Sequence, residues 1–284
     1  MKKFFLITGI LLVAVSLAIP AIAGVKNPDT FILANYGNLQ TLDPARAYDV
    51  TSSQRLWNIY EPLIFFSGSN TDKYKPLLAT EVPTLENGGI SNDGKTYTFT
   101  IRKGVKFHEG QTLIPEDVVY SFKRNMIADP DGGPMWMLLE ALTGEGSTRD
   151  KDGKIISGIF DKIDKCVEAK GDKVIFHLPR PYPPFMGILV YSSSIILNKQ
   201  WAIANGCWDG NIKNAAKYNA PAPGHEPLQK IANGTNAYKM KNWEPNKEFI
   251  FERFEGYWGP RPKIKTAIIK YIKEWSTRKL MLQN

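Results

Sequence analysis

The 284-residue sequence predicts an α+β fold, in which short strands and helices follow one another along the chain. Apolar residues recur at every second position over 97–101 and again at Val174, Phe176 and Leu178, a pattern typical of half-buried strands. Between them, Val118, Phe122 and Met126 recur at the spacing that places side chains on one face of a helix. Together these patterns indicate a soluble domain built from both kinds of element.

The other elements are expected along the whole chain, with no internal repeat and no low-complexity tract. In order they are a strand at 30–34, a loop at 35–49, a helix at 51–60, a loop-rich stretch at 132–158 around a short helix at 135–142, a strand at 189–197, a surface loop at 220–227, and strands at 249–251 and 264–272. Ser276 or Thr277 begins a last helix, whose apolar residues have just started to recur when the sequence stops at Asn284.

The segment 93–124 predicts a strand hairpin followed by a helix. Gly104 opens a turn after the first strand, and the apolar residues at 105 and 107 predict the return strand. Pro115 takes the first helical position. Glu116 and Asp117 follow in the first turn, where negative charge suits the positive end of the helix. Nothing in this unit is chemically reactive.

The N-terminus has the features of a secretory signal peptide. Lys2 and Lys3 precede an apolar run over 4–18, and 21–23 is a small-residue cleavage site before Gly24. The run is shorter than the roughly 20 apolar residues that a membrane span needs, although a membrane anchor is the alternative. No cysteine lies near the cleavage site for lipid attachment. We therefore expect residues 1–23 to be removed and the mature chain to be periplasmic in a Gram-negative cell.

The charge pattern does not point to nucleic acid. The chain carries 36 Lys and Arg residues against 28 Asp and Glu residues, a formal net charge of +8. These residues are interspersed along the whole chain, with no basic helix and no platform of aromatic and basic residues. We expect a solvated basic surface and no nucleic-acid partner.

Cys166 and Cys207 are the two cysteines of the chain. In an oxidising compartment they are candidates for a disulfide, and the alternative is a pair of buried free thiols, since Cys166 falls on an expected strand. There is no CxxC motif, so neither a thioredoxin-type site nor a zinc site has support.

Short motifs in a fixed order carry a family resemblance. They are TLDPA at 41–45, IYEPLI at 59–64, PLLA at 76–79, the unit at 93–124, PYPPF at 181–185, GTNAYKMKNW at 234–243 and ERFEGYWGPRPK at 252–263. From about residue 31 to the last residue, the chain resembles the family 5 extracellular solute-binding proteins, which are peptide- and nickel-binding receptors of ABC importers. Two departures are visible. Asn236-Ala237 stands where the family usually has Gly-Pro, and Ile114 replaces a capping Thr or Ser, at a cost of about 1 kcal/mol of helix stability.

The resemblance implies a periplasmic-binding-protein-like fold of two lobes, α+β with mixed sheets. Family members run to roughly twice this length, so an N-terminal fragment is expected, with the second lobe largely missing. The implied parts are lobe one at 24–64 and 188–272, a small extra domain at 65–187, and the start of the second lobe at 273–284.

The resemblance also implies the mechanism and the partners. The lobes close on a ligand like a hinge, and an importer recognises the closed form. The implied ligand is a di- or oligopeptide or another small solute, and the implied partners are the permease subunits of an ABC transporter. The protein is expected to act as a monomer, and no bond is made or broken.

Four residues are carried over as candidates for this half of the ligand cleft. Tyr48 and Asp49 occupy the loop after the first strand. Glu61 lies at the Tyr-Glu-Pro-Leu turn, and Trp136 aligns with an aromatic residue that faces the ligand in relatives. An indole offers a broad apolar face and one N–H donor, which suits varied ligands. Each candidate has a structural alternative: a surface loop residue, a helix cap, a turn carboxylate and a core residue, respectively.

An enzyme is the rival class. Glu116 with Asp117, or His108 with Glu109, are the adjacent pairs that acid–base or metal chemistry would use. Adjacent residues point in different directions, the start of the helix explains the acidic pair, and there is no GxSxG motif. We therefore expect no catalytic residue, no metal site and no cofactor. A nickel-chelate or haem carrier of the same family stays open as the alternative, and a periplasmic hydrolase as a further one.

Overall fold

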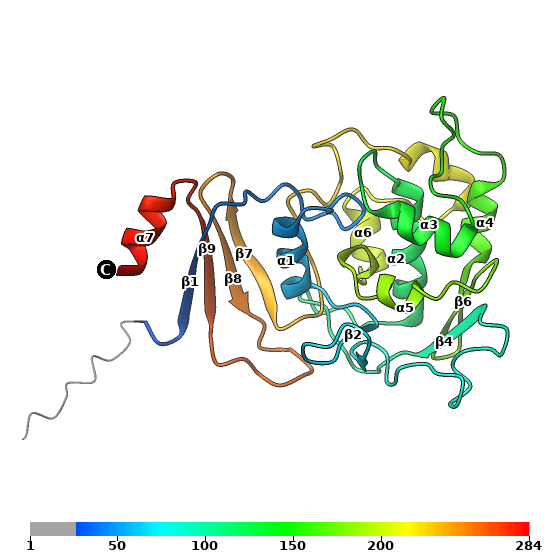
Figure 1. The fold of residues 1–284 in the computed structure, drawn as a ribbon, viewed down its shortest axis with the longest axis horizontal. Coiled ribbons are helices and arrows are strands. Elements are labelled where there is room, and N and C mark those ends of the chain that lie inside the picture. The colour runs from blue at the N-terminus through cyan, green and yellow to red at the C-terminus, as the bar shows by residue number, and fades with distance from the viewer. Residues whose placement is uncertain (1–26, 284) are drawn as a thin grey trace, which may run out of the picture.

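Three sheets and the helices between them make up residues 27–283, the part of the chain that a computed structural model describes (Figure 1). A four-stranded sheet lies at one end of the molecule, and α1 (Val50–Ile59) packs beside it. Most of the other helices and two smaller sheets form the other end. The predicted α+β class is confirmed. The predicted signal peptide at 1–23 lies outside the described residues.

The four-stranded sheet is mixed. Its order is β1–β9–β8–β7, formed by Thr30–Asn35, Thr266–Tyr271, Glu248–Arg253 and Tyr238–Glu244. β1 runs parallel to β9, whereas β8 is antiparallel to both of its neighbours. The strands predicted at 30–34, 249–251 and 264–272 are present. The sequence does not predict β7, because a register shift between Met240 and Asn242 interrupts its alternation.

A three-stranded antiparallel sheet lies at the other end of the molecule. Its order is β4–β6–β5, formed by Thr96–Thr100, Lys173–His177 and Val167–Lys170. The predicted hairpin is wrong, because β4 pairs with β6 and not with the residues after Gly104. The backbone at Val105 and Phe107 instead bonds to the loop that follows. Val105 O accepts from Leu113 N–H at 2.9 Å. Both side chains are fully buried, so their alternation reflects burial rather than pairing with β4.

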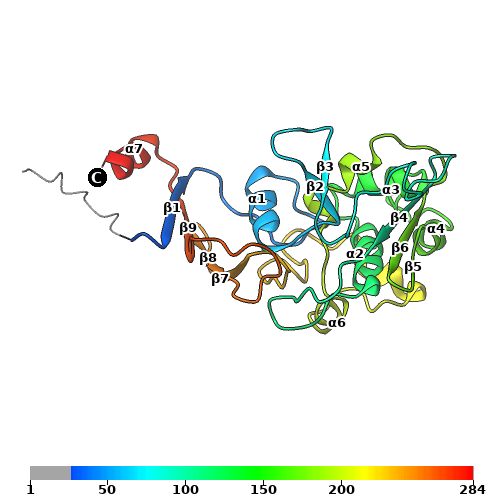
Figure 2. The same cartoon turned by 90° about the horizontal axis from the view of Figure 1, so that it is seen from below.

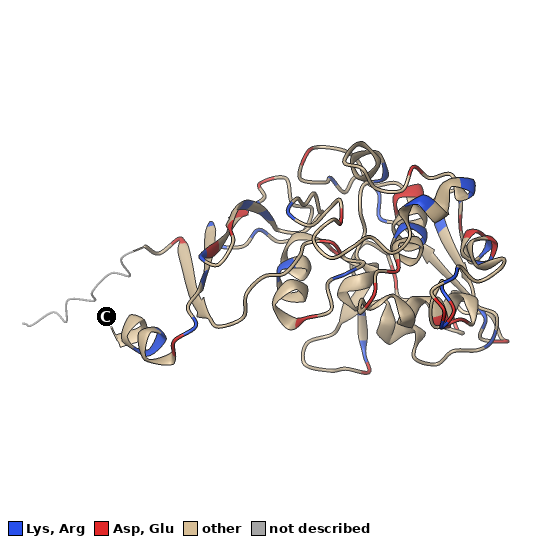
Figure 3. Ribbon diagram, turned by 90° about the horizontal axis from the view of Figure 1, so that it is seen from above, with Lys and Arg blue, Asp and Glu red and all other residues tan. Residues whose placement is uncertain are grey.

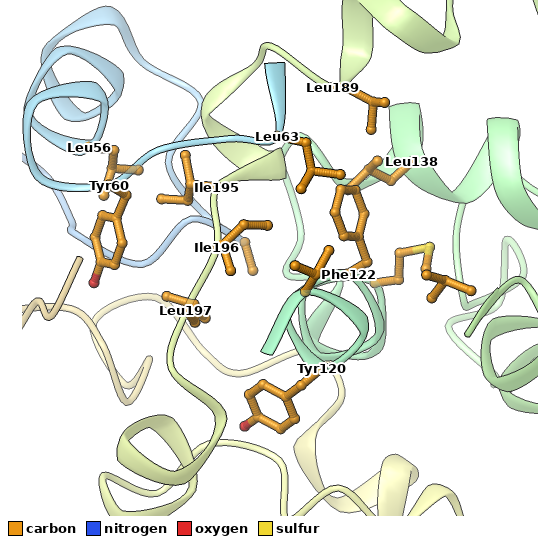
Figure 4. Packing of buried hydrophobic residues seen from close by; sticks show 14 of the residues in the cluster. Leu56, Tyr60, Leu63, Tyr120, Phe122, Leu138, Leu189, Ile195, Ile196 and Leu197 are labelled. Carbon is orange, nitrogen blue, oxygen red and sulfur yellow. The ribbon is translucent and has the colours of Figure 1, made fainter. Parts of the chain in front are cut away.

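Helix α2 (Pro115–Ala128) lies at the centre of the core. It begins at the predicted proline, and Ile114 makes no side-chain cap, as expected. Asp117 compensates in part, because its Oδ2 accepts from the Ile114 N–H at 3.0 Å. Figure 4 shows the chain at 195–197 running between Leu56 of α1 and Phe122 of α2, so one apolar cluster joins the two helices.

The predicted strand at 189–197 is wrong, although the segment is buried as expected. It follows α5 (Phe185–Ile188) and contains a 3-10 turn at Ser192–Ser194. Ser192 Oγ lies 3.0 Å from Ser53 Oγ, and the Ser194 hydroxyl donates to Ile188 O at 2.9 Å. The bond from Ser194 to Ile188 is local and offers the backbone an alternative to a sheet ladder.

Elements beyond residue 188 also pack against α2. They are α6 (Lys199–Ala204), which lies beside α2 in Figure 2, and a 3-10 helix at Ile212–Tyr218. The chain reaches the four-stranded sheet again only at β7. The remaining elements are β2 (Ile64–Phe66), β3 (Tyr74–Pro76), α3 (Met135–Thr143), α4 (Ile159–Lys165) and α7 (Trp275–Gln283).

Cys166 and Cys207 are both free and buried, so the structure shows the alternative of two buried thiols and not the candidate disulfide. Cys166 ends α4 rather than lying on a strand, and burial raises the pKa of its thiol to about 12. Cys166 lies near Lys123, whereas Cys207 lies near Arg124. Consecutive residues of a helix point roughly 100° apart, so the two thiols approach α2 from different sides.

Charged side chains of both signs are distributed over the whole fold (Figure 3). Acidic and basic residues often pair, as Lys123 does with Asp164 at 2.8 Å and Lys265 with Asp29 at 2.6 Å. This mixture agrees with a solvated surface. Among the helices of residues 27–283, none combines the length and the apolar character that a membrane crossing requires.

The partly buried His108 gives the fold a predictable response to acid. Its Nε2 lies 2.9 Å from Asn236 O, and its Nδ1 accepts from Gly234 N–H at 3.3 Å. Burial lowers the pKa of His108 from 6.5 to about 4, so the unfolded chain takes up a proton more readily than the folded one. The associated stability is complete above pH 6.5 and is lost as the pH falls through about 4.

We predict that the substitution His108→Gln removes much of this pH dependence. Between about pH 7 and pH 4.5, the free energy of unfolding of the variant should fall by roughly 2 kcal/mol less than that of the wild type. Urea denaturation at the two pH values measures the difference, and His225→Gln, at an exposed position, is the matched control. Equal losses in all three proteins would contradict the prediction.

Candidate ligand-binding site

An open cavity of about 350 Å³ lies where the loop before α1 meets the loop before α3. Tyr48 and Trp136, which are 88 positions apart in the sequence, both line it. Two of the four candidate residues are thus brought together. The other lining residues are Asp129, Pro130, Asp131, Gly132, Gly133, Gly146, Ser147 and Arg149.

Trp136 faces outward from the first turn of α3. The opposite side of this helix is apolar and packs into the core, where Met135, Leu138 and Leu139 are fully buried. The Trp136 side chain is 43% exposed, and its Nε1 donates to Tyr48 OH at 3.3 Å. Its alternative as a core residue is therefore excluded in this conformation.

Tyr48 is 46% exposed and is held by a second aromatic residue that the sequence did not predict. Tyr191 packs edge-on against it, with ring centroids 6.2 Å apart, and the Tyr191 hydroxyl donates to Tyr48 O at 3.4 Å. Trp57 of α1 continues the row, 6.3 Å from Tyr191. Tyr191 was missed because it lies in the segment that the sequence predicts as a strand.

A buried ion pair fixes the loop that carries Tyr48. Asp43 accepts from both terminal nitrogens of Arg124 at 2.5 Å, and both residues are at most 3% exposed. Asp43 Oδ1 also accepts from Ala45 N–H at 2.9 Å, which shapes the loop itself. Burial alone would lower the pKa of Arg124, but the charge and hydrogen bonds of Asp43, together with the nearby Cys207 and Tyr120, raise this pKa above its ordinary value. The loop at 41–49 is therefore anchored on α2.

Gly133 allows the two loops to approach closely. A Cβ atom added at Gly133 would lie 2.7 Å from Ala45 O, closer than such atoms come in proteins. Ala45 belongs to the loop before α1, and Gly133 to the loop before α3. The contact between their backbones therefore sets the distance between Tyr48 and Trp136.

The rim of the cavity carries a paired charge. Arg149 donates to Asp131 Oδ1 at 2.6 Å and to Asp129 O at 2.8 Å, while the Asp131 side chain is 89% exposed. The backbone of Asp129 is in the left-handed region, with φ of 28°. Its carboxylate accepts from both the N–H and the hydroxyl of Thr148. The cavity thus offers two aromatic faces, the Tyr48 hydroxyl and one exposed carboxylate that is paired with Arg149.

Asp49 serves the fold rather than the cavity. It is the N-cap of α1, and its Oδ1 accepts from Ser52 N–H at 2.9 Å. The helix-cap alternative is therefore what the structure shows, and Asp49 is not among the residues that line the cavity.

Glu61 cannot contact a ligand in this conformation, so its candidacy is corrected here. Its side chain is buried, with 1% of the residue exposed. Burial raises the pKa of Glu61, and hydrogen bonds from neighbouring donors oppose this effect. These donors are Trp258 Nε1, the Thr235 hydroxyl and the Tyr257 hydroxyl, at 2.8 to 3.1 Å. Glu61 therefore ties the loop after β8 to the end of α1.

The residue pairs weighed as enzyme sites have structural roles. His108 bonds to backbone atoms, as described above, and Glu109 Oε1 accepts from Trp201 Nε1 at 2.8 Å. Asp117 accepts from Ile114 N–H at the start of α2, and its Oδ1 also accepts from Lys199 N–H at 2.7 Å. Within residues 27–283, no group of three or more His, Cys, Asp or Glu side chains is arranged to hold a metal ion.

Residues 73–284 match the model of the bacterial extracellular solute-binding proteins, family 5. The match covers well over half of the chain. The chain therefore belongs to this family, as its motifs suggested.

Known proteins of this family resemble the chain over most of its length. The Dipeptide-binding protein of Escherichia coli is 27% identical over 288 residues, which are 97% of this chain and 47% of that protein. The structure of the periplasmic binding protein DppA from Helicobacter pylori, in complex with the peptide STSA, aligns with a TM-score of 0.66 and 26% identity over 89% of this chain and 44% of that one. The chain thus spans less than half the length of these relatives.

A third likeness is to the fold alone. The structure of NikA from Brucella suis, in complex with Fe(III)-EDTA, aligns with a TM-score of 0.63 over 89% of this chain and 41% of that one, at 22% identity. Proteins whose structures hold a peptide and a metal chelate therefore share the arrangement of elements described here.

We predict that Gly133→Ala separates the two loops and destabilises the protein by about 1 to 3 kcal/mol, because the added methyl group meets a backbone oxygen. Gly146→Ala is the matched control: Gly146 lines the same cavity, but a Cβ atom there meets nothing within 4 Å. Urea denaturation of both variants provides the test. A Gly133 variant as stable as the Gly146 variant would show that the close contact does not constrain the loops.

Proposed function

We propose that this chain belongs to the periplasmic substrate-binding component of an ABC transporter. It captures di- or oligopeptides by hinge closure and delivers them to a membrane permease. The protein is exported by a cleavable signal peptide, is not a lipoprotein and acts as a monomer. No covalent bond changes in this cycle, so the proposal requires no catalytic residue.

The observation that carries the proposal is the aromatic wall of Tyr48 and Trp136. Both side chains are nearly half exposed, although each stands on an element that is anchored in the core. Aromatic faces with a polar edge can contact peptide side chains of different shape, because they combine apolar area with a hydrogen-bonding group. A pre-formed wall of this kind is typical of ligand sites.

Family membership supports the same conclusion from a separate direction. The relatives named above include a dipeptide-binding protein and a structure in complex with a four-residue peptide. In a two-lobe receptor, a wall that is exposed in the open form loses its water only when the lobes meet. The exposure of Trp136 fits the open form of such a receptor.

We predict that Trp136→Ala weakens peptide binding by about 1 to 3 kcal/mol and leaves the fold nearly as stable, since the ring is 43% exposed. Isothermal titration with a pool of alanyl dipeptides and tetrapeptides measures the affinity, and thermal unfolding measures the stability. Trp275→Ala, at a 68% exposed position outside the cavity, is the matched control.

Two outcomes would contradict the proposal. Unchanged affinity together with a large loss of stability in the Trp136 variant would make this residue a structural one. Binding of a nickel chelate or of haem, with no response to any peptide of the pool, would favour the alternative of a metal-chelate or haem carrier within the same family.

A further inference from the structure

A second cavity lies on the other side of α1, between this helix and the four-stranded sheet. Its volume is about 400 Å³, which is within the range of small-molecule sites, about 300 to 1,000 Å³. Most of its walls are apolar, and none of them is shared with the cavity of Tyr48 and Trp136. The lining residues are Phe31, Leu33, Gln54, Arg55, Asn58, Tyr238, Phe251, Ile264, Ala267 and Ile269.

The sheet offers this cavity one face of three neighbouring strands. Phe31 and Leu33 of β1 pair with Ala267 and Ile269 of β9, and Phe251 of β8 pairs with Ala267 in turn. Phe31 is 50% exposed and Leu33 is 40% exposed, because β1 is the edge strand. An apolar floor is therefore available to a ligand that enters beside β1.

Arg55 is the charged group in this apolar wall. It is 4% exposed, and burial lowers the pKa of its guanidinium. One terminal nitrogen donates to Thr51 O at 3.1 Å and to Gln54 Oε1 at 3.4 Å, both within the same helix. Its Nε is buried and has no partner among residues 27–283.

No carboxylate of the described residues forms an ion pair with Arg55. Asp49 is the acidic residue whose charge acts on it, but the Asp49 side chain is occupied as the cap of α1. Arg124 on α2 is also deeply buried, but it has a bidentate partner in Asp43. A buried charge without such a partner is costly, so Arg55 stands out as a cation prepared for an anion that the described residues do not supply.

We propose that this cavity binds a small apolar monocarboxylate, with its carboxylate on Arg55 and its apolar part between α1 and the face of β1, β9 and β8. A guanidinium suits a carboxylate because its planar donors match the two oxygens. The apolar walls offer no second cation for a diacid and no carboxylate for an amine. The site is separate from the peptide wall, so it goes beyond the function proposed above.

The test uses decanoate as the probe and decanol as its neutral match, each titrated into the purified chain below the concentration at which it aggregates. We expect decanoate to bind at least about tenfold more tightly than decanol, because only the carboxylate pairs with Arg55. Arg55→Met should bind decanoate at least about tenfold more weakly than the wild type and should not be less stable, since an unpaired buried charge is replaced by an apolar side chain of similar length. Ala267→Phe fills the cavity and should also abolish binding, with Arg55 still in place.

Several results would overturn this inference. They are equal affinity for decanoate and decanol, undiminished decanoate binding by Arg55→Met, or no binding by the wild type. A dimer of the chain that dissociates on Arg55→Met would also overturn it, because a second copy would then occupy the cavity. Trp136→Ala should leave decanoate binding unchanged, so failure here is distinguishable from failure of the proposed peptide site.

Discussion

The buried ion pair of Asp43 and Arg124 is the interaction on which the rest of the site depends. A buried pair gains little over apolar packing, but removal of one partner leaves an uncompensated charge and costs about 3 to 5 kcal/mol. Asp43 belongs to a loop without regular structure, and Arg124 belongs to the central helix α2. The pair therefore ties this loop to the core, together with the buried apolar side chains of Leu42, Ala45 and Ala47.

Further contacts hold the same loop from other directions. Arg46 pairs with Glu226 and donates to Pro221 O at 2.7 Å, so the loop is also joined to the segment at 220–227. Asp49 begins α1 directly after Tyr48. Tyr48 is thus an exposed residue between Arg46 and Asp49, which are both anchored. It meets Trp136 because the backbone of the loop before α1 touches the backbone of the loop before α3 at Gly133. An aromatic wall that is preformed in this way loses little conformational freedom when a ligand arrives.

The sequence predicted those elements that local patterns determine. α2 was predicted because Pro115 and its apolar spacing act within one helix, and β1 and β8 because each contains a short run of apolar residues. Pairing over long distances was not predictable in this way. The alternation of Val105 and Phe107 suggested a return strand, but their backbone bonds to the loop that follows them, and β4 takes β6 as its neighbour. The segment at 189–197 forms a 3-10 turn and no strand, and Ser192 there bonds to Ser53, which only the fold brings near.

The candidate site was predicted only in part, for a similar reason. The family resemblance placed Tyr48 and Trp136, and the structure puts them in one cavity. It also suggested Glu61, but burial among Thr235, Tyr257 and Trp258 decides the role of that carboxylate, and these partners lie more than 170 positions away. Tyr191 and Arg55 carried no signal in the sequence, since their importance comes from what packs around them and, for Arg55, from what does not.

The most direct test of this account is hydrogen exchange of the loop amides in an Arg124→Met variant. Without its partner, Asp43 should release the loop, so the amides of Ala45 and Ala47, which donate to Asp43 in the wild type, should exchange faster while those of α2 stay protected. Lys123→Met is the matched control, because Lys123 is the adjacent residue of α2 and forms its ion pair with the exposed Asp164. Unchanged protection of Ala45 and Ala47 in the Arg124 variant would show that the ion pair does not hold the loop.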